Sequence, residues 1–467
     1  MTAPSATRPD SIFVQIASYR DSQLIPTLRN LIDKARNPDL LRIVVCWQHA
    51  SDEALGAFWQ QGFGKWRTTT ANGWPHHLLD YRGAGVELID VPHLRTRGAC
   101  WARNLIQRRY GGERYTLQLD SHHRFVNHWD TRAIDMLESL RDESTKPVLT
   151  AYLPAFDPES DSAPSETPQF MCFDRFGVEG VVMFRGRHLR ADEIRQRPVR
   201  ARFYSAHFAF ADGHFSEAVQ HDPDFFFLGE EISIAARAFT HGYDLYHPHR
   251  VIAWHEYTRR HRVKMWDDHT DQAKQRGDID AHWVERDTRA YRRNRMLLGV
   301  DGQICSQNDF GRYGLGTQRT LAEYEAYAGI SFARRGVHEA TLNHEPPQPP
   351  GASHADDPAW NERLRRANDV RVCLHRNTFD EFATTQPAQG TLSAARSAVV
   401  TIHDENGLEQ HRETIDTQGL SERRTNDWLD FHVIFLSALE HVPGRYAVEL
   451  LDGGGNLLSR VEHTVIV

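Results

Sequence analysis

The chain lacks any long hydrophobic segment, and this limits the kinds of protein it can be. None of its apolar runs approaches the roughly 20 residues that cross a bilayer. The segment from Met1 to Asp10 is small and polar and has no hydrophobic stretch typical of a signal peptide. We therefore expect a cytoplasmic protein without a membrane partner.

Cysteine is scarce, and an excess of basic residues is missing as well. The five cysteines are scattered and form no C-x-x-C pair, which favours reduced thiols over disulfides or a zinc ribbon. The formal charge is −8 and no long Lys/Arg tract is present. Because binding to phosphate backbones needs a basic face, we expect no nucleic-acid partner.

The first two thirds of the chain alternate between strand and helix patterns. A length of 467 residues suggests two or three domains. Apolar, β-branched runs predict strands, and an amphipathic pattern from about Asp21 to Arg36 predicts a helix. Such alternation predicts a Rossmann-like, mostly parallel α/β sheet flanked by helices. The clearest predicted strands are Ser11 to Ala17, Leu41 to Trp47, Val86 to Val91 and Tyr115 to Asp120.

The pattern changes in the last quarter of the chain. Several prolines and acids between His344 and Asp357 are typical of a linker. Beyond them, apolar and polar residues alternate between turn signals, and Tyr446 to Leu451 should pair with Arg460 to Val467 as a hairpin. We therefore predict an α/β domain at 11–335, a linker at 336–368 and a β-sandwich at 369–467.

A metal site is the main functional hypothesis from the residues themselves. Asp120 ends a predicted strand and His122 follows two positions later. Residues two apart in an extended segment point to the same side, so both side chains can bind one divalent cation. In open α/β sheets, ligands bind at this carboxyl end of the strands. An isolated D-x-H pair can also be incidental, and His123 has the opposite parity, which suits packing.

Several ordered motifs resemble one enzyme family. Asp120-Ser-His122 is similar to the D-x-D/D-x-H motif of GT-A-type glycosyltransferases. The motifs I-x-S-Y-R-D, V-x-V-C-W-Q, W-A-R-N, F-x-G-E-E-I-S-x-A-A-R, W-H-E-Y-x-R and Y-G-L-G-T-x-R-T-L resemble the polypeptide N-acetylglucosaminyltransferase family, including its bacterial relatives. The similarity spans roughly Ile12 to Phe332 and leaves the C-terminal β-region uncovered.

The resemblance implies transfer of GlcNAc from UDP-GlcNAc to a hydroxyl of a peptide, protein or small acceptor, with retention of configuration. It also implies His255 as a third metal ligand beside Asp120 and His122, although a buried structural histidine would suit the same pattern. A carboxylate with imidazoles suits Mn²⁺ better than Ca²⁺, and Mg²⁺ remains an alternative.

The same resemblance implies a donor site around the metal. Ser121 should face the ribose, and Ser18, Tyr19 and Arg20 should border the uridine. The other candidates each have a structural alternative, such as core packing for Trp47 or a solvated arginine. These candidates are Trp47, Arg97, Arg103, Arg259 and Arg312. The glycine-rich segment from Gly311 to Gly316 is either a loop that closes over the donor or an ordinary turn.

Two adjacent acids are the catalytic candidates. Glu230 and Glu231 begin a predicted helix that ends near Gly242. Either acid could orient or deprotonate the acceptor hydroxyl, or both could only complement the helix dipole. We favour Glu231. The competing hypotheses for the whole protein are a carbohydrate-binding or scaffold protein without turnover, and a metal hydrolase. The C-terminal region is expected to select the acceptor or to form a homo-oligomer.

Overall fold

The computed structural model forms two compact units. It describes residues 10–465, with gaps at 161, 178, 190–192, 194, 259–261, 304–305, 349, 352–356, 385–389 and 426. The first unit comprises the described parts of Met1–Phe173, Phe184–Ala328 and His344–Ala355. The second comprises those of Asp174–Met183, Gly329–Asn343 and Asp356–Val467.

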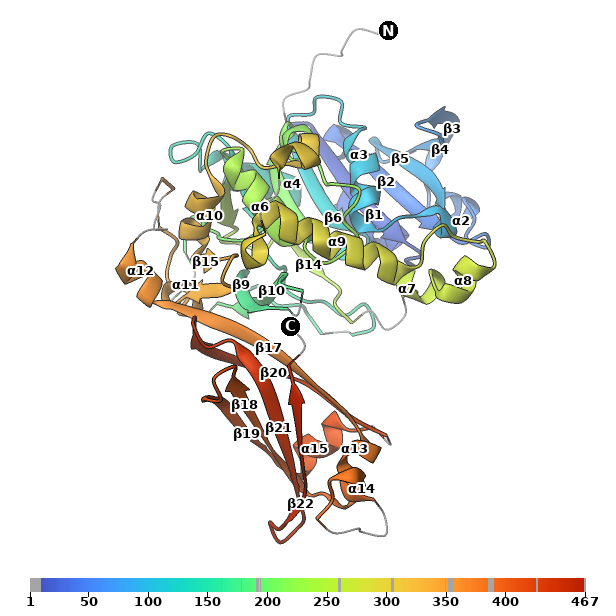
Figure 1. Cartoon of the computed structure of the whole chain (residues 1–467). Helices are drawn as coiled ribbons and strands as arrows, with labels where there is room; N and C mark the ends of the chain where they lie inside the picture. Colours follow the sequence, from blue (N-terminus) through green and yellow to red (C-terminus); the bar gives the residue numbers. More distant parts are fainter. Residues whose placement is uncertain are drawn as a thin grey trace. The chain divides into compact units, whose positions relative to one another are not determined.

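A ten-stranded sheet organises the first unit (Figure 1). Its strands are β1 (Ile12–Tyr19), β2 (Leu41–His49), β3 (Gly64–Ala71), β4 (Trp74–Tyr81), β5 (Ala84–Pro92), β6 (Tyr115–Asp120), β8 (Pro147–Thr150), β11 (Val199–Arg200), β12 (Phe208–Asp212) and β13 (Asp244–His247). Their order is β11-β13-β8-β12-β6-β1-β2-β5-β4-β3. The central strands β6, β1, β2 and β5 are parallel, whereas β12, β4 and β3 pair antiparallel.

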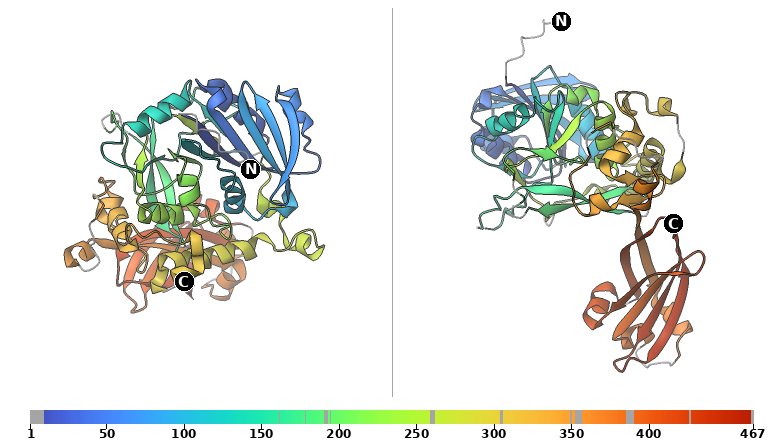
Figure 2. Two further views of the ribbon diagram at one scale, coloured as in Figure 1. Left: turned by 90° about the horizontal axis from the view of Figure 1, so that it is seen from above. Right: turned by 90° about the vertical axis from the view of Figure 1, so that its left-hand side faces the viewer.

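Helices cover both faces of this sheet because its central strands are apolar on both sides (Figure 2). Val14 and Ile16 of β1 pack in one core cluster with α1 (Leu24–Lys34) and α4 (Trp129–Glu138). Phe13 points to the opposite face and packs with α3 (Ala99–Gln107). The alternation along one strand therefore connects two hydrophobic layers.

Further helices complete the first unit. They are α2 (Gly56–Gln60), α5 (Phe215–Ala218), α6 (Glu230–Thr240), α7 (Met265–Asp268), α8 (Asp271–Gln275), α9 (Trp283–Leu298) and α10 (Leu321–Ala328). The predicted helix after Gly229 is α6. The polar segment between His255 and Leu298 contains α7, α8 and α9. The strands β9 (Gln169–Phe176) and β10 (Val182–His188) form a separate two-stranded sheet.

The second unit contains two four-stranded antiparallel sheets. One has the order β15-β16-β17-β20 and the other β19-β18-β21-β22. Their bounds are β15 (Ile330–Ser331), β16 (Gly336–His338), β17 (Leu364–His375), β18 (Ser397–Asp404), β19 (Glu409–Ile415), β20 (Trp428–Ala438), β21 (Pro443–Leu451) and β22 (Leu457–Thr464). The short helices of this unit are α11 (Glu339–Leu342), α12 (Pro358–Glu362), α13 (Arg376–Glu381), α14 (Thr391–Ala394) and α15 (Thr417–Arg423).

Alternating apolar residues of both sheets form the core of this sandwich. Along β20, Leu429, Phe431 and Val433 are buried, while the residues between them are exposed. They share one hydrophobic cluster with Val400 of β18 and Val448 of β21. The predicted hairpin of the last two strands is present as β21 and β22.

The predicted fold class, an α/β sheet flanked by helices together with a C-terminal β-sandwich, is confirmed. The large sheet is mixed, with its parallel strands at the centre. The predicted boundary between the linker and the β-sandwich, at 368 and 369, falls inside β17, which begins at Leu364. Within the described residues, no helix is both long and apolar enough to cross a membrane.

Candidate functional site

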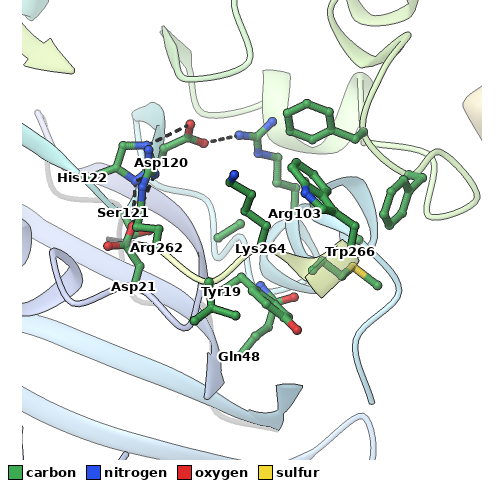
Figure 3. A pocket seen from close by; sticks show the side chains of 17 residues that line it. Tyr19, Asp21, Gln48, Arg103, Asp120, Ser121, His122, Arg262, Lys264 and Trp266 are labelled. Atoms are coloured by element: carbon green, nitrogen blue, oxygen red, sulfur yellow. Dashed lines mark hydrogen bonds and ion pairs between the residues drawn. The ribbon is translucent and has the colours of Figure 1, made fainter. Parts of the chain in front are cut away.

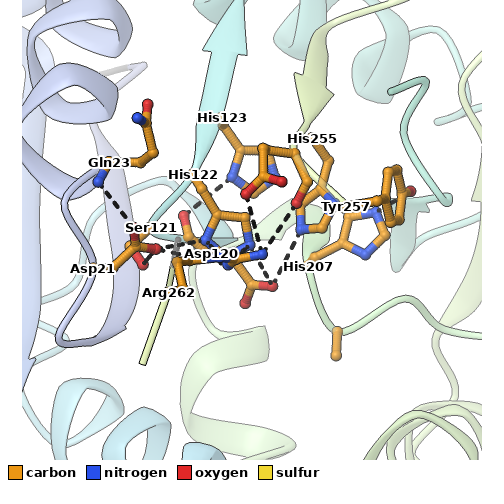
Figure 4. A network of polar contacts seen from close by, with 12 residues as sticks. Asp21, Gln23, Asp120, Ser121, His122, His123, His207, His255, Tyr257 and Arg262 are labelled. Carbon is orange, nitrogen blue, oxygen red and sulfur yellow. Dashed lines mark hydrogen bonds and ion pairs between the residues drawn. The ribbon is translucent and has the colours of Figure 1, made fainter. Parts of the chain in front are cut away.

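Three potential metal ligands converge at the carboxyl end of β6. Asp120 is the last residue of β6, His122 follows in the adjoining loop, and His255 ends β14 (Ala253–His255). Their ligand atoms all lie within 4.8 Å of one another. From Oδ2 of Asp120, the Nε2 atom of His255 is 3.4 Å away and that of His122 is 3.7 Å away (Figure 4). One carboxylate and two imidazoles form a donor set that suits a divalent transition metal.

A short ladder brings His255 to this site from a distant part of the chain. Strand β14 pairs antiparallel with β7 (His123–Phe125), and His255 lies opposite His123. The two rings are 5.0 Å apart, which places both on the same face of the ladder. Burial holds the pKa of His255 well below its usual value, so the imidazole is neutral. The neutral form is the one that binds a metal.

Asp21 orients the imidazole of His122. Its carboxylate accepts a 2.7 Å hydrogen bond from Nδ1 of His122 and another of 2.7 Å from the Ser121 hydroxyl. Burial acts to raise the pKa of Asp21, but His122 and Ser121 together hold it below its ordinary value. With Nδ1 engaged in this way, Nε2 is the nitrogen that faces Asp120. The Arg262 guanidinium lies 2.6 Å from this Nε2 atom, so a metal ion bound there would displace it.

Arg103 links the candidate metal ligand Asp120 to Glu230. Its guanidinium is buried, donates a 2.7 Å hydrogen bond to Asp120 and contacts the Glu230 carboxylate. His221 lies 2.7 Å from the same carboxylate. Burial acts to raise the pKa of Asp120, yet His255 and Arg103 hold it well below its usual range. Arg103 and Glu230 therefore fix an ionised Asp120 in place.

A pocket of about 170 Å³ lies beside the triad (Figure 3). Asp120, Ser121, His122 and Arg103 line one part of it. The remaining wall includes side chains from several other elements, among them Tyr19, Gln48, Phe226, Lys264 and Trp266.

Tyr19, which lines this pocket, and the neighbouring Arg20, which does not, are held by one carboxylate. The Tyr19 hydroxyl donates a 2.6 Å hydrogen bond to Asp268, and Arg20 forms a 2.9 Å ion pair with the same group. The Lys264 ammonium lies 5.9 Å from the centroid of the Trp266 ring and forms no salt bridge with any residue that the structure describes, so its charge is available in the pocket.

The other donor candidates lie outside the pocket lining. Ser18 is buried and its carbonyl accepts a hydrogen bond from Gln48, while Trp47 is buried in the core and stacks on His49. Arg97 and Arg312 are exposed and do not line the pocket. Arg259 lies outside the described residues. Of the predicted glycine-rich loop, Gly311 to Tyr313 end a 3-10 helical segment, Gln307–Tyr313, in which Gly311 itself has non-helical backbone angles.

The two candidate acids have different surroundings. The Glu230 carboxylate is occupied by Arg103 and His221. Glu231 accepts hydrogen bonds from the Tyr152 hydroxyl at 2.8 Å and the Ala206 amide at 2.9 Å. Burial raises the pKa of Glu231 to about 7, although both donors act to lower it. Glu231 is therefore the acid that can exchange a proton near neutral pH.

An aromatic contact series connects Glu231 to the triad. Its partner Tyr152 lies 5.0 Å from the His207 ring, and His207 stacks on His255 at 4.3 Å. His207 accepts a hydrogen bond from the Leu153 amide. Neither acid lines the pocket itself.

Sequence reasoning missed Asp21, Arg262, Lys264 and Trp266 as site residues. Asp21 stands in the quoted I-x-S-Y-R-D motif and could have been found there as the acid after the first strand. Lys264 and Trp266 surround Met265 and lie in no recognised motif. Their position depends on the course of the chain after β14, which no local pattern predicts.

The comparisons with known proteins agree with a sugar-transferring chemistry. A family model described as "Glycosyltransferase (GlcNAc)" matches residues 11–334. No curated protein matches the sequence.

Similar solved structures were found at low sequence identity. One is GalNAc-T7 with UDP, GalNAc and Mn²⁺, at 14% identity and a TM-score of 0.39, covering 55% of this chain and 44% of that chain. Another is S. aureus TarS 1-349 in complex with UDP, at 10% identity and a TM-score of 0.32, covering 53% of this chain and 61% of that chain. A third is the mannosyltransferase PcManGT from Pyrobaculum calidifontis in complex with GDP-Man and Mn²⁺, at 13% identity and a TM-score of 0.34. The match covers 71% of this chain and 74% of that chain. The chain spans less than two thirds of the first two.

Proposed function

The chain belongs to the glycosyltransferase (GlcNAc) family, and from this premise we propose that it transfers GlcNAc from UDP-GlcNAc to an acceptor hydroxyl with retention of configuration. Its first unit has the mixed sheet flanked by helices of GT-A-type glycosyltransferases. The observation that carries the proposal is the convergence of Asp120, His122 and His255 next to a pocket at the carboxyl end of the sheet. The acceptor would be a peptide, a protein or a small hydroxylated molecule.

The three converging side chains fit a divalent cation, and we propose Mn²⁺, with Mg²⁺ as the alternative. Asp120 supplies a charged oxygen, and His122 and His255 supply imidazole nitrogens. When bound, the cation neutralises charge on the diphosphate leaving group. Asp21 and Arg103 hold two of the ligands, so the site is ordered before the donor arrives.

The pocket walls suit the remaining parts of a nucleotide sugar. Tyr19 offers an aromatic face for the base, and the Gln48 side chain is close enough to line the same space. Lys264 and Arg262 bring positive charge to the region expected for the diphosphate, although Arg262 is also paired with Glu256 at 3.2 Å and with Asp21 at 3.7 Å. Their charge would also favour the departing UDP once the glycosidic bond has broken.

Glu231 is the proposed proton acceptor. As the bond from the anomeric carbon to the diphosphate breaks, the acceptor oxygen forms the new bond to that carbon on the same face, which retains the configuration. The hydroxyl proton then passes to the Glu231 carboxylate. A pKa of about 7 suits this task, because at neutral pH about half of the carboxylate is ionised and it is a stronger base than an ordinary carboxylate.

Release of UDP provides the test of this proposal. The purified protein is incubated with UDP-GlcNAc, UDP-GalNAc, UDP-glucose and GDP-mannose, with Mn²⁺ or with EDTA, and free nucleotide is measured. We expect Mn²⁺-dependent release from UDP-GlcNAc and a loss of about a hundredfold or more in Asp120→Asn and His255→Gln.

Matched variants separate chemistry from misfolding. Asp135 is exposed on α4 and outside the pocket, so Asp135→Asn removes the same charge and should leave release unchanged. Circular dichroism checks that each variant is folded. No release from any nucleotide sugar would favour a binding or scaffold protein, and equal release in Asp120→Asn would contradict the role of the triad.

A further inference from the structure

A second, larger hollow lies on the opposite face of the β7–β14 ladder. Arg124 pairs with Trp254 in this ladder, one position away from the His123–His255 pair. Successive residues of a strand point to opposite faces, so Arg124 and Trp254 face away from the triad. Both line a hollow of about 890 Å³, which we call the basic hollow.

The basic hollow has more cations than acids. Arg124, Lys34, Arg132 and Arg250 line it, against the acids Asp157 and Glu166. Within the described part of the chain, none of these four cations forms a salt bridge with a carboxylate; Arg124 donates to the His123 carbonyl and to Gln23. Unneutralised positive charge gathered in a concave surface attracts anions.

Two of these cations lie close enough to repel one another. Burial lowers the pKa of Arg132, and the charge of Arg250 lowers it further. Arg132 donates a 2.8 Å hydrogen bond to the Val251 carbonyl, which fixes its position without neutralising it. Glu166 acts in the opposite direction but forms no ion pair with it. A bound anion would relieve this repulsion.

A small hollow of about 30 Å³ lies between the basic hollow and the donor pocket. It shares Arg262 with the donor pocket, and it shares Asp157 and Pro158 with the basic hollow. All three belong to the first unit. The charged lining of the small hollow is Asp157, Glu159 and Glu256 against Arg262, so the segment that passes through it toward the triad should carry no negative charge, while an acidic segment stays in the basic hollow.

We propose that the basic hollow binds an acidic polypeptide segment of the acceptor at a distance from the hydroxyl that is modified. This inference rests on the proposed function. The hollow selects the acceptor by charge and has no part in the chemistry or in donor binding.

The lining favours a polypeptide over a phosphate polymer. Phe156 and Trp254 offer apolar surface for side chains, and the Arg124 guanidinium stacks over the Phe156 ring at 4.9 Å. Asp157 and Glu166 would repel a dense row of phosphates, whereas carboxylates spaced along a peptide can avoid them.

Binding of a labelled peptide tests the proposal. The probe is a fluorescein-labelled peptide of alternating Glu and Ser, with a matched peptide that has Gln in place of Glu, measured by anisotropy at low salt. We expect the full chain to bind the acidic peptide and not the Gln peptide. The double variant Arg132→Gln/Arg250→Gln should lose about tenfold or more in affinity.

The control variant removes the same charge elsewhere on the first unit. Arg67 and Arg108 are exposed and line none of the three hollows, so Arg67→Gln/Arg108→Gln should bind the peptide as the unmodified chain does. Release of UDP from UDP-GlcNAc without peptide should be equal in all three proteins.

The other outcomes contradict either the inference or the proposed function on which it rests. Equal peptide affinity in the two double variants, or no preference for Glu over Gln, would exclude charge selection by this hollow. Tight binding of inorganic polyphosphate without peptide binding would identify a phosphate-polymer site instead. If no protein releases UDP but the charge effect persists, the proposed function fails while the anion site stands.

Discussion

At the scale of single residues, Asp21 has the most specific positioning role in the site. It accepts hydrogen bonds from both Ser121 and His122, and thus fixes which imidazole nitrogen faces Asp120. Carboxylates that orient metal-binding histidines typically change metal affinity by about 10–100-fold when replaced. Asp21 is therefore a positioning residue and does not touch the donor chemistry directly.

Replacement of Asp21 should weaken the metal site while keeping turnover at saturating metal. In Asp21→Asn the shape is kept, but the charge that fixes His122 is lost, so we expect the Mn²⁺ concentration for half-maximal UDP release to rise about 10–100-fold. Titration of Mn²⁺ at saturating UDP-GlcNAc measures this, with Asp135→Asn as the control. An unchanged midpoint would exclude the orienting role.

The pH dependence of transfer should report Glu231. Its pKa is raised to about 7 by burial, so the ionised base becomes the major form above pH 7 and transfer should rise through that region. In Glu231→Gln the rise should disappear and the rate should fall about 10²–10⁴-fold. A pH–rate profile of both proteins at saturating metal is the measurement.

The same pKa predicts an effect on stability with a defined sign. The unfolded carboxyl ionises near its ordinary value of 4.5, whereas the folded one ionises at about 7. Between these values folding binds a proton, so Glu231 makes the protein less stable as pH rises. The melting temperature of Glu231→Gln relative to the unmodified chain should therefore increase from pH 5 to pH 7. A constant difference would contradict the raised pKa.

At the scale of elements, the start of α3 forms part of the donor pocket. Gly98 precedes α3 with φ of +117°, and a Cβ atom there would lie 2.8 Å from the Phe226 carbonyl oxygen. Both residues line the pocket. Only glycine adopts this conformation without strain, and the close approach leaves no room for a methyl group.

Gly98→Ala should therefore disturb stability and donor binding together. We expect a loss of about 1–3 kcal/mol in unfolding free energy and weaker UDP binding. Urea unfolding and UDP titration measure the two effects. Gly85→Ala is the control, because a Cβ atom at Gly85 in β5 meets no neighbour within 4 Å. If Gly98→Ala had the same unfolding free energy and UDP affinity as the unmodified chain, Phe226 would have to move aside for the added methyl group.

The sequence predicted the central elements well, because their signals are local. The buried strands β1 and β2 are mostly apolar, β5 and β6 have apolar residues at alternate positions, and α1 has a clear apolar face. The hairpin of β3 and β4 was missed because both strands carry many polar residues, such as Thr68 and His77. Half-polar strands at a sheet edge lack the apolar run on which prediction depends.

The candidate site was predictable only where its residues are neighbours in the sequence. Asp120 and His122 form a local pattern, and the family resemblance added His255. The approach of Arg262 to His122 and the pairing of Arg103 with Glu230 join residues more than a hundred positions apart. Such contacts depend on tertiary packing, which also decided that Trp47 lies in the core.

At the scale of the whole molecule, the role of the second unit is better tested by substitution than by truncation. Strand β17 pairs along its whole length with β20, and the second unit includes segments from three parts of the chain. A truncation after residue 368 would leave the first part of β17 without its partner strand. The role of the β-sandwich in acceptor selection or self-association stays a prediction that substitutions on its surface can test.

Metal and donor together should stabilise the folded first unit. Ligands that bind only the folded state raise its stability, by about 2.7 kcal/mol at a hundred times their dissociation constant. We therefore expect Mn²⁺ with UDP to raise the melting temperature, EDTA to remove the effect, and Asp120→Asn to lack it. Differential scanning fluorimetry is sufficient, and stabilisation by UDP alone to the same extent would argue against a metal bridge.

The most direct measurement of the central claim is anomalous diffraction at the manganese edge from crystals grown with Mn²⁺ and UDP-GlcNAc. The account predicts one strong peak within coordination distance of Asp120, His122 and His255, bridged to the diphosphate of a nucleotide in the pocket lined by Tyr19 and Lys264. A bound nucleotide without metal density between these three side chains would contradict it.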